Sequence, residues 1–317
     1  MCPVWHGTTP ASALRECITL AQHVEELGYH RIWVAEHHGL ESLATSSPGV
    51  LSAAMAGQTS QIRVGAGGVM LPNHSPVAVA EQFGTLEALF PGRIDLGLGR
   101  ASGSDPALIQ RLHHGRDDVP FESQIEELES YFDDPAGRPV VVPAAGNRPA
   151  SYLLGASPDS GRIAGKLGLP YAFAHHIAPD AASDSIAAYR ASFVPGRREL
   201  PWAILATRVV IADTLEAARD AALPSVLGQV MARLNGRSDP FPRDEDVPPL
   251  ASLPRNVRAF IEDRLAAHVL GDPASARAQV QHLMTNAGAD ELMALTMIPD
   301  MRKRHRSFEL LAAALQN

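Results

Sequence analysis

The sequence of 317 residues is poor in cysteine and in aromatic residues, with two cysteines, Cys2 and Cys17, and 5% Phe, Trp and Tyr. Two cysteines allow one disulfide at most, so a reducing cytoplasm is the expected compartment. No apolar run approaches the roughly 20 residues of a transmembrane helix. The N-terminal residues also lack the basic and apolar segments of a secretory signal peptide. We therefore expect a cytoplasmic protein that makes no use of a membrane.

Positive charge is scarce as well. The net charge is −8 and the sequence contains no basic stripe, which argues against nucleic acid as a partner. Apolar residues make up 45% and charged residues 20% of the chain, the balance of a globular protein. The length suits two ordinary domains or one large α/β barrel.

Helix starts and strands alternate along the chain. Proline at a first helical position, after a Ser, Thr or Asp that caps the helix, occurs at Thr9-Pro10, Ser47-Pro48, Ser75-Pro76, Asp105-Pro106 and Asp272-Pro273. Apolar runs of strand length cover residues 31–35, 62–71, 93–99, 152–156, 171–175, 203–212 and 291–298. This alternation predicts a parallel sheet, either doubly wound and open or closed into a (β/α)8 barrel.

The number of strands favours the α/β class with a (β/α)8 TIM barrel. Seven strands and the N-terminal residues 1–5 make eight, and residues 1–317 suit one barrel domain with insertions. Because residues 1–5 are few, the first strand is expected to be truncated. Residues 236–256 are rich in proline and charge, which predicts a mobile loop within a long insertion before the last strand.

Polar residues gather directly after the predicted strands. The active site of a parallel barrel lies at the carboxyl ends of its strands. The residues at these positions are Glu36, His37, His38, His74, Gly99, Arg100, Ser157, Ser160, His175 and His176. Together they predict an active site at this end of the barrel.

Two chemistries fit these residues poorly. A metal site needs several ligands on one side, whereas adjacent His37 and His38 on an extended chain point to opposite faces. The segment GLGRASG at 97–103 resembles a dinucleotide fingerprint, but its third glycine is displaced. Neither a bound metal nor a nicotinamide cofactor is therefore the favoured prediction.

A phosphorylated cofactor fits better. Arg100 and the N-terminus of a helix that begins at Ser157 can hold a phosphate, with Ser160 as a further donor and Gly161 allowing close approach. The segment GAGGVML at 65–71 places three glycines inside a strand, which marks either close packing or a ligand lying against the backbone.

Three segments resemble the bacterial luciferase-like flavin monooxygenases, nearest to their alkanal monooxygenase-like branch. They read LGYHRIWVAEHHG at 27–39, IRVGAGGVMLPNHSPVAVAEQFGTLEALFPGRIDLGLGR at 62–100 and GADELMALTMIPDMRKRHRSFELL at 288–311. The resemblance implies a barrel that binds reduced FMN, which a separate flavin reductase supplies. It also implies that O2 is the co-substrate that oxidises a small organic molecule, such as an aldehyde or a secondary-metabolite intermediate.

The resemblance also implies roles for individual residues. It makes His37 the proton-handling residue beside the flavin, with Glu36 and His38 in support. It implies a non-proline cis peptide at Gly67-Gly68. The remaining expectations are phosphate contacts from Arg100, Ser157, Ser160 and Gly161, a flavin-facing Gly99 where some luciferases carry a cysteine, and a substrate pocket with His74, His175 and His176.

Two other functions stay open for a chain of this family. One is a flavin-binding barrel without catalysis, which the short first strand favours. The other is an F420-dependent oxidoreductase, although such relatives tend to carry Asp-His where this chain has Glu36-His37-His38. Family members often form homodimers, so we expect a homodimer, for which Met55 and nearby alanines offer one face.

Overall fold

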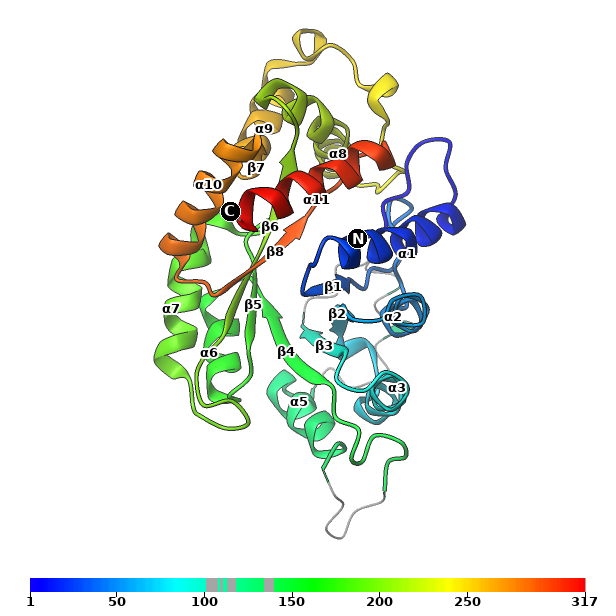
Figure 1. Cartoon of the computed structure of the whole chain (residues 1–317), viewed down its shortest axis with the longest axis vertical. Coiled ribbons are helices and arrows are strands. Elements are labelled where there is room, and N and C mark those ends of the chain that lie inside the picture. The colour runs from blue at the N-terminus through cyan, green and yellow to red at the C-terminus, as the bar shows by residue number, and fades with distance from the viewer. Residues whose placement is uncertain (101–107, 109–110, 113–117, 134–139, 317) are drawn as a thin grey trace.

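The protein is described by a computed structural model that covers residues 1–100, 108, 111–112, 118–133 and 140–316 (Figure 1). The predicted helix start at Asp105-Pro106 lies outside these residues. The strands are β1 (Arg31–Val34), β2 (Arg63–Met70), β3 (Ile94–Gly99), β4 (Ala150–Gly155), β5 (Tyr171–Ala174), β6 (Ala203–Ile211), β7 (Val269–Gly271) and β8 (Glu291–Leu295).

Five of the ten described α-helices begin where the sequence predicts, with a proline at the first position after a residue that can cap. The α-helices are α1 (Pro10–Glu26), α2 (Pro48–Ala56), α3 (Pro76–Leu89), α5 (Phe121–Ser130), α6 (Pro158–Lys166), α7 (Ala182–Ser192), α8 (Leu215–Asn235), α9 (Arg255–Ala266), α10 (Pro273–Ala287) and α11 (Met301–Gln316). The 3-10 turns are η1 (Leu71–Asn73), η2 (Pro179–Ala181), η3 (Asp244–Asp246) and η4 (Leu250–Ser252). No helix in this part of the chain is both long and apolar enough to cross a membrane.

All strands pair in parallel. β1 to β6 are neighbours in chain order, and β6 then pairs with β8 along its first half and with β7 at its end. In Figure 1, α1, α2 and α3 lie outside β1 to β3, and α6, α7 and α10 lie outside the opposite side of the sheet. The predicted α/β class, with a curled parallel sheet, is confirmed.

The sheet curls without closing through hydrogen bonds. Among the described strands no ladder joins β1 to β8, so the full barrel predicted from the sequence is not observed. Arg31 Nε at the start of β1 instead donates to Glu291 Oε1 of β8 at 2.7 Å. α11 packs against both α1 and β6, and Tyr29 Oη donates to the Phe308 carbonyl at 2.9 Å. Side chains and a helix therefore link the two edges.

The N-terminal residues are not a truncated first strand, which corrects the prediction. Pro3 makes an antiparallel bridge with Leu43, and Trp5 makes a parallel bridge with Phe241. Trp5 is fully buried and packs against Phe241 and Met297. Proline offers no N–H to a ladder, and the Trp5 ring is buried against loops beyond the carboxyl ends of the strands.

The segment 236–256, predicted to be a mobile loop, is anchored along its middle. The Phe241 N–H donates to the Val4 carbonyl at 2.8 Å. His6 Nδ1 lies 2.9 Å from Asp246 Oδ2. The segment belongs to the insertion between β6 and β7, a strand of three residues that is too short to show a pattern in the sequence.

Two large apolar cores support the sheet, beside smaller apolar clusters. The main core fills the space between the sheet and its outer helices, and Met55 within it is 0% exposed. Met55 therefore cannot form the dimer face suggested from the sequence. A second core, which includes Val210, Val226 and Ile261, holds α8 and α9 against the end of β6. Burial of such side chains contributes about 1.5–3 kcal/mol each to stability.

The amino-terminal ends of the strands meet in a cluster of paired charges. The fully buried Asp95 accepts hydrogen bonds from Arg31 Nη1 and Arg63 Nη2, both at 2.6 Å. Arg31 Nη1 also donates to Tyr152 Oη at 2.6 Å, and its Nε bonds to Glu291. We call Arg31, Arg63, Asp95, Tyr152 and Glu291 the floor cluster.

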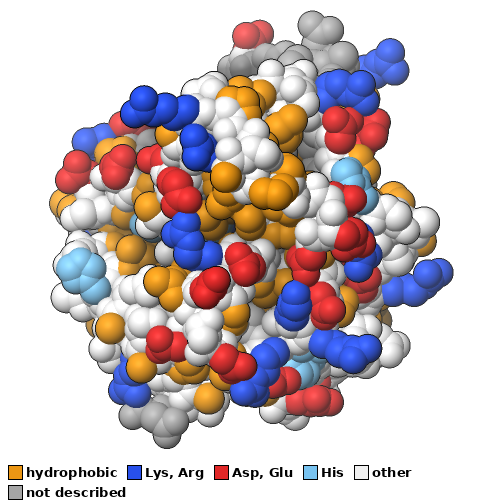
Figure 2. All heavy atoms as spheres, turned by 90° about the horizontal axis from the view of Figure 1, so that it is seen from above, with side chains coloured by type: hydrophobic (Ala, Val, Ile, Leu, Met, Phe, Trp, Pro, Cys, Tyr) orange, Lys and Arg blue, Asp and Glu red, His pale blue; other side chains and the backbone are white. Residues whose placement is uncertain are grey.

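The surface carries charges of both signs. On the face shown in Figure 2, acidic and basic side chains are interspersed around a hydrophobic area, and no region of a single sign dominates it. This agrees with the lack of a basic stripe in the sequence.

Candidate active site

The carboxylate of Glu36 collects hydrogen bonds directly after β1. Its side chain is fully buried and accepts from His38 Nε2 at 2.8 Å and from His74 Nε2 at 2.9 Å. The Met70 N–H at 3.1 Å and Asn73 Nδ2 at 3.3 Å also donate to it. These five residues, which we call the Glu36 network, tie the loop after β1 to the end of β2.

The network keeps Glu36 ionised. Burial alone raises the pKa of this carboxyl, but hydrogen bonds from His74 and His38 and the charge of His74 outweigh it, so the pKa lies below its usual range. An ionised carboxylate accepts hydrogen bonds only, which fixes both imidazole rings. His38 and His74, expected beside the flavin and in the substrate pocket, are thus held by the same carboxylate.

His37 lies between Glu36 and His38 in the sequence but takes no part in the network. Its backbone N–H donates to the Thr45 carbonyl at 2.8 Å, whereas its buried Nδ1 has no hydrogen-bond partner among the described residues. Burial, with smaller effects from nearby positive groups, lowers the pKa of His37 to about 4. The ring is therefore neutral at pH 7, and Nδ1 is free to bond to a ligand or to take part in proton transfer.

His175 and His176 follow β5 and have different partners. His175 is buried, and its Nδ1 lies 2.9 Å from Thr207 Oγ1. His176 Nδ1 donates to the Ala206 carbonyl at 3.0 Å, so Nε2 carries the free lone pair. Burial lowers the pKa of His176 to about 4. The charge of His176 also has a small effect on the pKa of His37.

The glycines of β2 and β3 permit close packing. The peptide bond Gly67-Gly68 is cis, as the resemblance implies. A Cβ at Gly67 would lie 2.7 Å from Trp33 Cε3, and one at Gly68 would lie 2.7 Å from the Gly97 carbonyl oxygen. A Cβ at Gly99 would lie 2.6 Å from Met70 Cε. Packing alone thus disfavours a side chain at Gly67 and Gly68, whereas the end of the Met70 side chain can move away from Gly99. A flavin ring against this backbone stays a prediction.

The serines at the start of α6 form a capping box. Ser157 Oγ accepts from the Ser160 N–H at 3.4 Å, and Ser160 Oγ accepts from the Ser157 N–H at 3.2 Å. Ser160 Oγ also lies 2.8 Å from Tyr171 Oη. Gly161 faces α7, where a Cβ would lie 2.4 Å from the Ser185 carbonyl oxygen. Both serine hydroxyls therefore cap the helix, whereas the positive end of the helix dipole is still available to bind an anion.

Arg100 lies near this helix start. It is exposed directly after β3, and the pairing of Leu98 with Leu153 makes β3 and β4 neighbours. Arg100 and Ser157 therefore follow adjacent strand ends. An exposed guanidinium and a helix N-terminus are a suitable pair for a phosphate.

The nicotinamide interpretation of GLGRASG loses its structural basis. Gly97 and Gly99 lie buried inside β3, whereas the glycines of a dinucleotide fingerprint form the turn between a strand and a helix. The last residues of the motif, 101–103, lie outside the described part of the chain.

A metal ion has no cluster of ligands in the described residues, where no three His, Cys, Asp or Glu side chains are arranged to hold one. In the Glu36 network the imidazole nitrogens of His38 and His74 point at the carboxylate itself.

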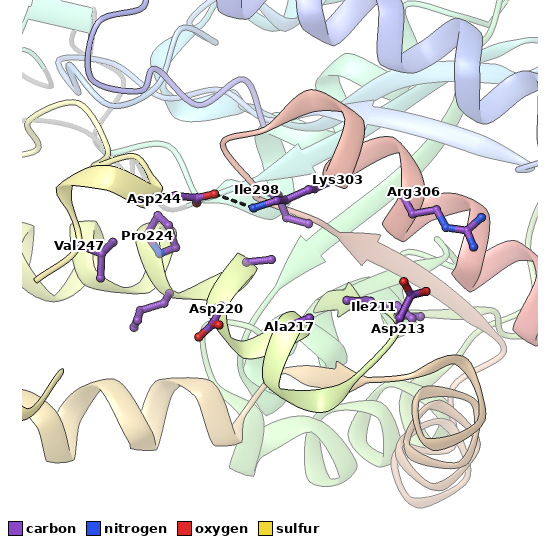
Figure 3. Close-up of a pocket in the computed structure, with 13 residues that line it drawn as sticks. Ile211, Asp213, Ala217, Asp220, Pro224, Asp244, Val247, Ile298, Lys303 and Arg306 are labelled. Atoms are coloured by element: carbon purple, nitrogen blue, oxygen red, sulfur yellow. Dashed lines mark hydrogen bonds and ion pairs between the residues drawn. The ribbon is translucent and has the colours of Figure 1, made fainter. Parts of the chain in front are cut away.

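A cavity of about 550 Å³ lies apart from all of these residues, between α8 and the start of α11 (Figure 3). Asp220, Pro224 and Ile298 contribute to its lining, and Lys303 Nζ pairs with Asp244 Oδ2 across it at 2.8 Å. No residue predicted for the active site lines it, so we do not place the site there.

Sequence reasoning missed two polar residues close to the predicted ones. Arg208 lies on β6, and His268 directly precedes β7. Asn73, which follows the predicted strand 62–71 and was expected at this end of the sheet, joins the Glu36 network. A charged residue within the apolar run AILATRVVIA was an available signal for Arg208. His268 had none, because β7 was not predicted.

A model of the luciferase-like monooxygenase family matches residues 2–291. The chain belongs to this family. A luciferase-like monooxygenase of Escherichia coli (strain K12) is 37% identical over 321 residues, which cover 98% of this chain and 93% of that protein. An N-acetyl-S-alkylcysteine monooxygenase of Bacillus subtilis (strain 168) is 41% identical over 184 residues, 55% of this chain and 54% of the other.

Solved structures share the fold. The crystal structure of apo-MsnO8 matches with a TM-score of 0.88 and 38% identity, covering 99% of this chain and 96% of that one. The oxygenating constituent of 3,6-diketocamphane monooxygenase from Pseudomonas putida, solved with FMN, matches with a TM-score of 0.73 and 19% identity over 98% and 95% of the two chains. An F420-dependent secondary alcohol dehydrogenase matches with a TM-score of 0.67 and 14% identity over 98% and 96%. At these lower identities the likeness concerns the fold alone.

Proposed function

We propose that the protein is a monooxygenase that uses reduced FMN and O2 to oxidise a small organic substrate. The observation that carries the proposal is His37, whose buried Nδ1 has no partner although the adjacent Glu36 accepts several hydrogen bonds. A buried polar atom without a partner calls for an explanation, and a cofactor or substrate beside β1 supplies one.

The described residues fit FMN. Arg100 and the positive end of α6 are suited to its phosphate. Reduced FMN, when bound, supplies the two electrons that activate O2. The chain then has to orient the ring, exclude water and handle protons.

His37 is the group that we assign to proton handling. Its pKa of about 4 keeps the ring neutral at pH 7, so it can accept a proton at Nδ1 and then release one from the other nitrogen. The Glu36 network fixes the chain on both sides of His37, because Glu36 and His38 are bonded to each other at 2.8 Å. A fixed ring position serves catalysis because misplacement of the reacting groups lowers the rate.

A separate flavin reductase is the proposed source of reduced FMN. The first glycines of the segment that resembles a nicotinamide fingerprint, Gly97 and Gly99, lie inside β3 and not in a turn, which supports a reductase on a separate chain. We also propose a homodimer, which light scattering of the purified protein tests.

The comparisons suggest two substrate classes. The Bacillus relative is named for a thioether, an N-acetyl-S-alkylcysteine, and the resemblance of the sequence points to aldehydes. Both accept one oxygen atom, at sulfur or at carbon, and both are small enough for a site at the end of a barrel.

Labelled dioxygen tests the proposal. The protein, FMN, NADH and a flavin reductase are incubated under labelled O2 with a panel of aldehydes and thioethers, and products are analysed by mass spectrometry. We expect a product that gains one labelled oxygen atom only when the protein is present. Reduction of added F420 by an alcohol, without oxygen transfer, would favour the F420-dependent alternative. Tight FMN binding with neither reaction would favour a flavin-binding barrel without catalysis.

A further inference from the structure

Arg208 occupies an unusual place on β6. It lies in the middle of the sheet, where β6 has β5 on one side and β8 and β7 on the other. Val209 pairs with Val269, so the preceding residues, Arg208 and His268, stand side by side. Neighbouring residues of paired strands point to the same face of a sheet.

His176 completes the surroundings of Arg208 on the side of β5. Its backbone N–H donates to the Ala206 carbonyl at 3.2 Å, and its ring donates to the same oxygen. The charge of Arg208 acts on both His176 and His268. Arg264, near the end of α9, acts on Arg208 and His268. Two arginines, from β6 and α9, and two histidines, one after β5 and one before β7, are therefore electrostatically coupled.

This group has no acidic counterpart in the described residues. Arg208 Nη1 and His268 Nδ1 are buried without a hydrogen-bond partner. Burial and the charge of Arg264 lower the pKa of Arg208 to about 10, and burial with the nearby positive charges lowers the pKa of His268 to about 3. No described carboxylate acts on either residue.

A buried guanidinium without an anion is destabilising, because no partner replaces its lost hydration. The floor cluster of the same sheet shows the contrast, since Arg31 there contacts both Asp95 and Glu291. A costly group that the fold does not compensate is typical of a functional site. A bound anion would supply the missing partner.

We propose that Arg208, flanked by His176 and His268, is an anion subsite that binds a carboxylate of the organic substrate. A planar guanidinium binds a carboxylate through two parallel hydrogen bonds. His176 bonds to the Ala206 carbonyl, two residues before Arg208, and its charge acts on His37, so a carboxylate on Arg208 would place the rest of the molecule toward His37. This subsite rests on the proposed function, because it takes His37 to mark the reacting end.

The flavin phosphate is the other possible anion. Arg100 and the start of α6 already offer it a site after β3 and β4, whereas Arg208 lies on β6. Arg208 is therefore a second, separate group of hydrogen-bond donors for an anion, beside the one that the phosphate of the cofactor would use.

Calorimetric titration of the whole chain with octanoate and with 1-octanol tests the subsite, because the two probes differ chiefly in their charged group. We expect octanoate to bind the wild-type protein more tightly than 1-octanol. Arg208→Met should weaken octanoate binding by roughly 30-fold or more and leave 1-octanol unchanged. Arg208→Lys keeps the charge without the paired donors and should lose less. Arg219→Met, which removes an exposed arginine of α8, is the matched control and should bind both probes like the wild type.

Thermal unfolding separates a binding role from a structural one. Because Arg208 has no partner in the described residues, Arg208→Met should raise Tm, and added octanoate should raise the Tm of the wild type only. A variant that unfolds at a lower temperature, or fails to fold, would show that Arg208 stabilises the protein and would overturn the proposal.

FMN and riboflavin distinguish the source of the anion. Arg208→Met should bind both flavins like the wild type. If it loses affinity for FMN but keeps its affinity for riboflavin, the subsite belongs to the flavin phosphate and the substrate assignment is wrong. Equal binding of octanoate and 1-octanol by the wild type would overturn the anion subsite altogether. Neither result depends on turnover, so the monooxygenase proposal stands or falls separately by the labelled-oxygen assay.

Discussion

The two ends of the parallel sheet differ in whether their buried polar groups have hydrogen-bond partners. At the amino-terminal end, the floor cluster pairs each arginine with a carboxylate, and Asp95 alone accepts hydrogen bonds from both Arg31 and Arg63. At the carboxyl end, His37 Nδ1, Arg208 Nη1 and His268 Nδ1 are buried without partners in the described residues. The first arrangement stabilises a fold, and the second leaves groups available for ligands.

The difference also separates residues that hold the sheet from residues that act. Arg31 joins β1 to β8 where no ladder does, so the floor cluster replaces a missing strand contact with ion pairs. The Glu36 network lies at the other end but resembles the floor cluster, because its carboxylate is fully engaged. His37 and Arg208 differ from both, and we assign function to them on that ground.

Breaking the floor cluster should have the largest effect on stability. Asp95→Asn leaves Arg31 and Arg63 buried with weakened pairing, so we expect a loss of about 3–5 kcal/mol in the free energy of unfolding. Urea denaturation measures it. The control is Asp159→Asn, which breaks an exposed pair with Arg162 and should leave the urea midpoint unchanged. A urea midpoint for Asp95→Asn within error of the wild type would show that the floor cluster does not stabilise the fold.

Removing the unpaired imidazole of His37 should lower turnover and leave the stability of the fold unchanged. His37→Asn takes away the group that we assign to proton handling, so product formation in the reductase-coupled assay should fall roughly 10²- to 10⁴-fold. The urea midpoint should hold, because His37 Nδ1 makes no hydrogen bond that is lost. Wild-type turnover by this variant would show that the proton path lies elsewhere.

Weakening the hydrogen bonds of the Glu36 network should lower both stability and turnover, each by a smaller amount. Glu36→Gln replaces a buried acceptor of several hydrogen bonds by a group that also donates, so we expect a loss of roughly 1–3 kcal/mol in stability. Turnover should also fall, because the residues on both sides of His37 lose their anchor. A variant with unchanged stability would mean that the hydrogen bonds of Glu36 contribute little.

The pH dependence of stability offers the smallest and most specific test. The pKa of His176 is about 4 in the folded chain and near 6.5 when unfolded. The unfolded state therefore binds more protons between these values, and the free energy of unfolding should decrease as the pH falls from about 6.5 toward 4. Each buried histidine with a pKa lowered in this way decreases the free energy of unfolding by on the order of 1–2 kcal/mol at pH 5.

His176→Gln should flatten this slope, and the same substitution at the exposed His30 should keep it. The contribution of Glu36 to stability changes over a different pH range. Its folded pKa is lowered, so its stabilisation is complete above the usual carboxyl range and is lost only as the pH falls below it. A His176→Gln slope equal to that of the wild type would contradict the buried, neutral assignment.

Much of this architecture can be read from the sequence. Proline after Thr9, Ser75 or Ser157 marks helix starts because a missing N–H costs nothing there. Apolar runs mark the long strands. The Glu-His-His motif and Arg100 stand out because they follow such runs directly.

The errors have physical causes. Residues 1–5 were assigned to the sheet by counting strands, but Trp5 is buried against Phe241, a contact between distant segments that no local pattern shows. Gly161 suggested an approach for ligands, whereas its position against α7 depends on how two helices pack. Glu36 and His74 were assigned separately because only the fold brings the carboxylate to both imidazoles.

Reduced FMN, on the proposed function, binds at the carboxyl end of the sheet beside the unpaired His37. The most direct measurement mixes the protein and reduced FMN with aerated buffer in a stopped-flow instrument and follows flavin reoxidation and release of hydrogen peroxide. We predict that the wild type slows both processes relative to free reduced FMN and that His37→Asn alters their rates. Identical traces with and without the protein would contradict the account.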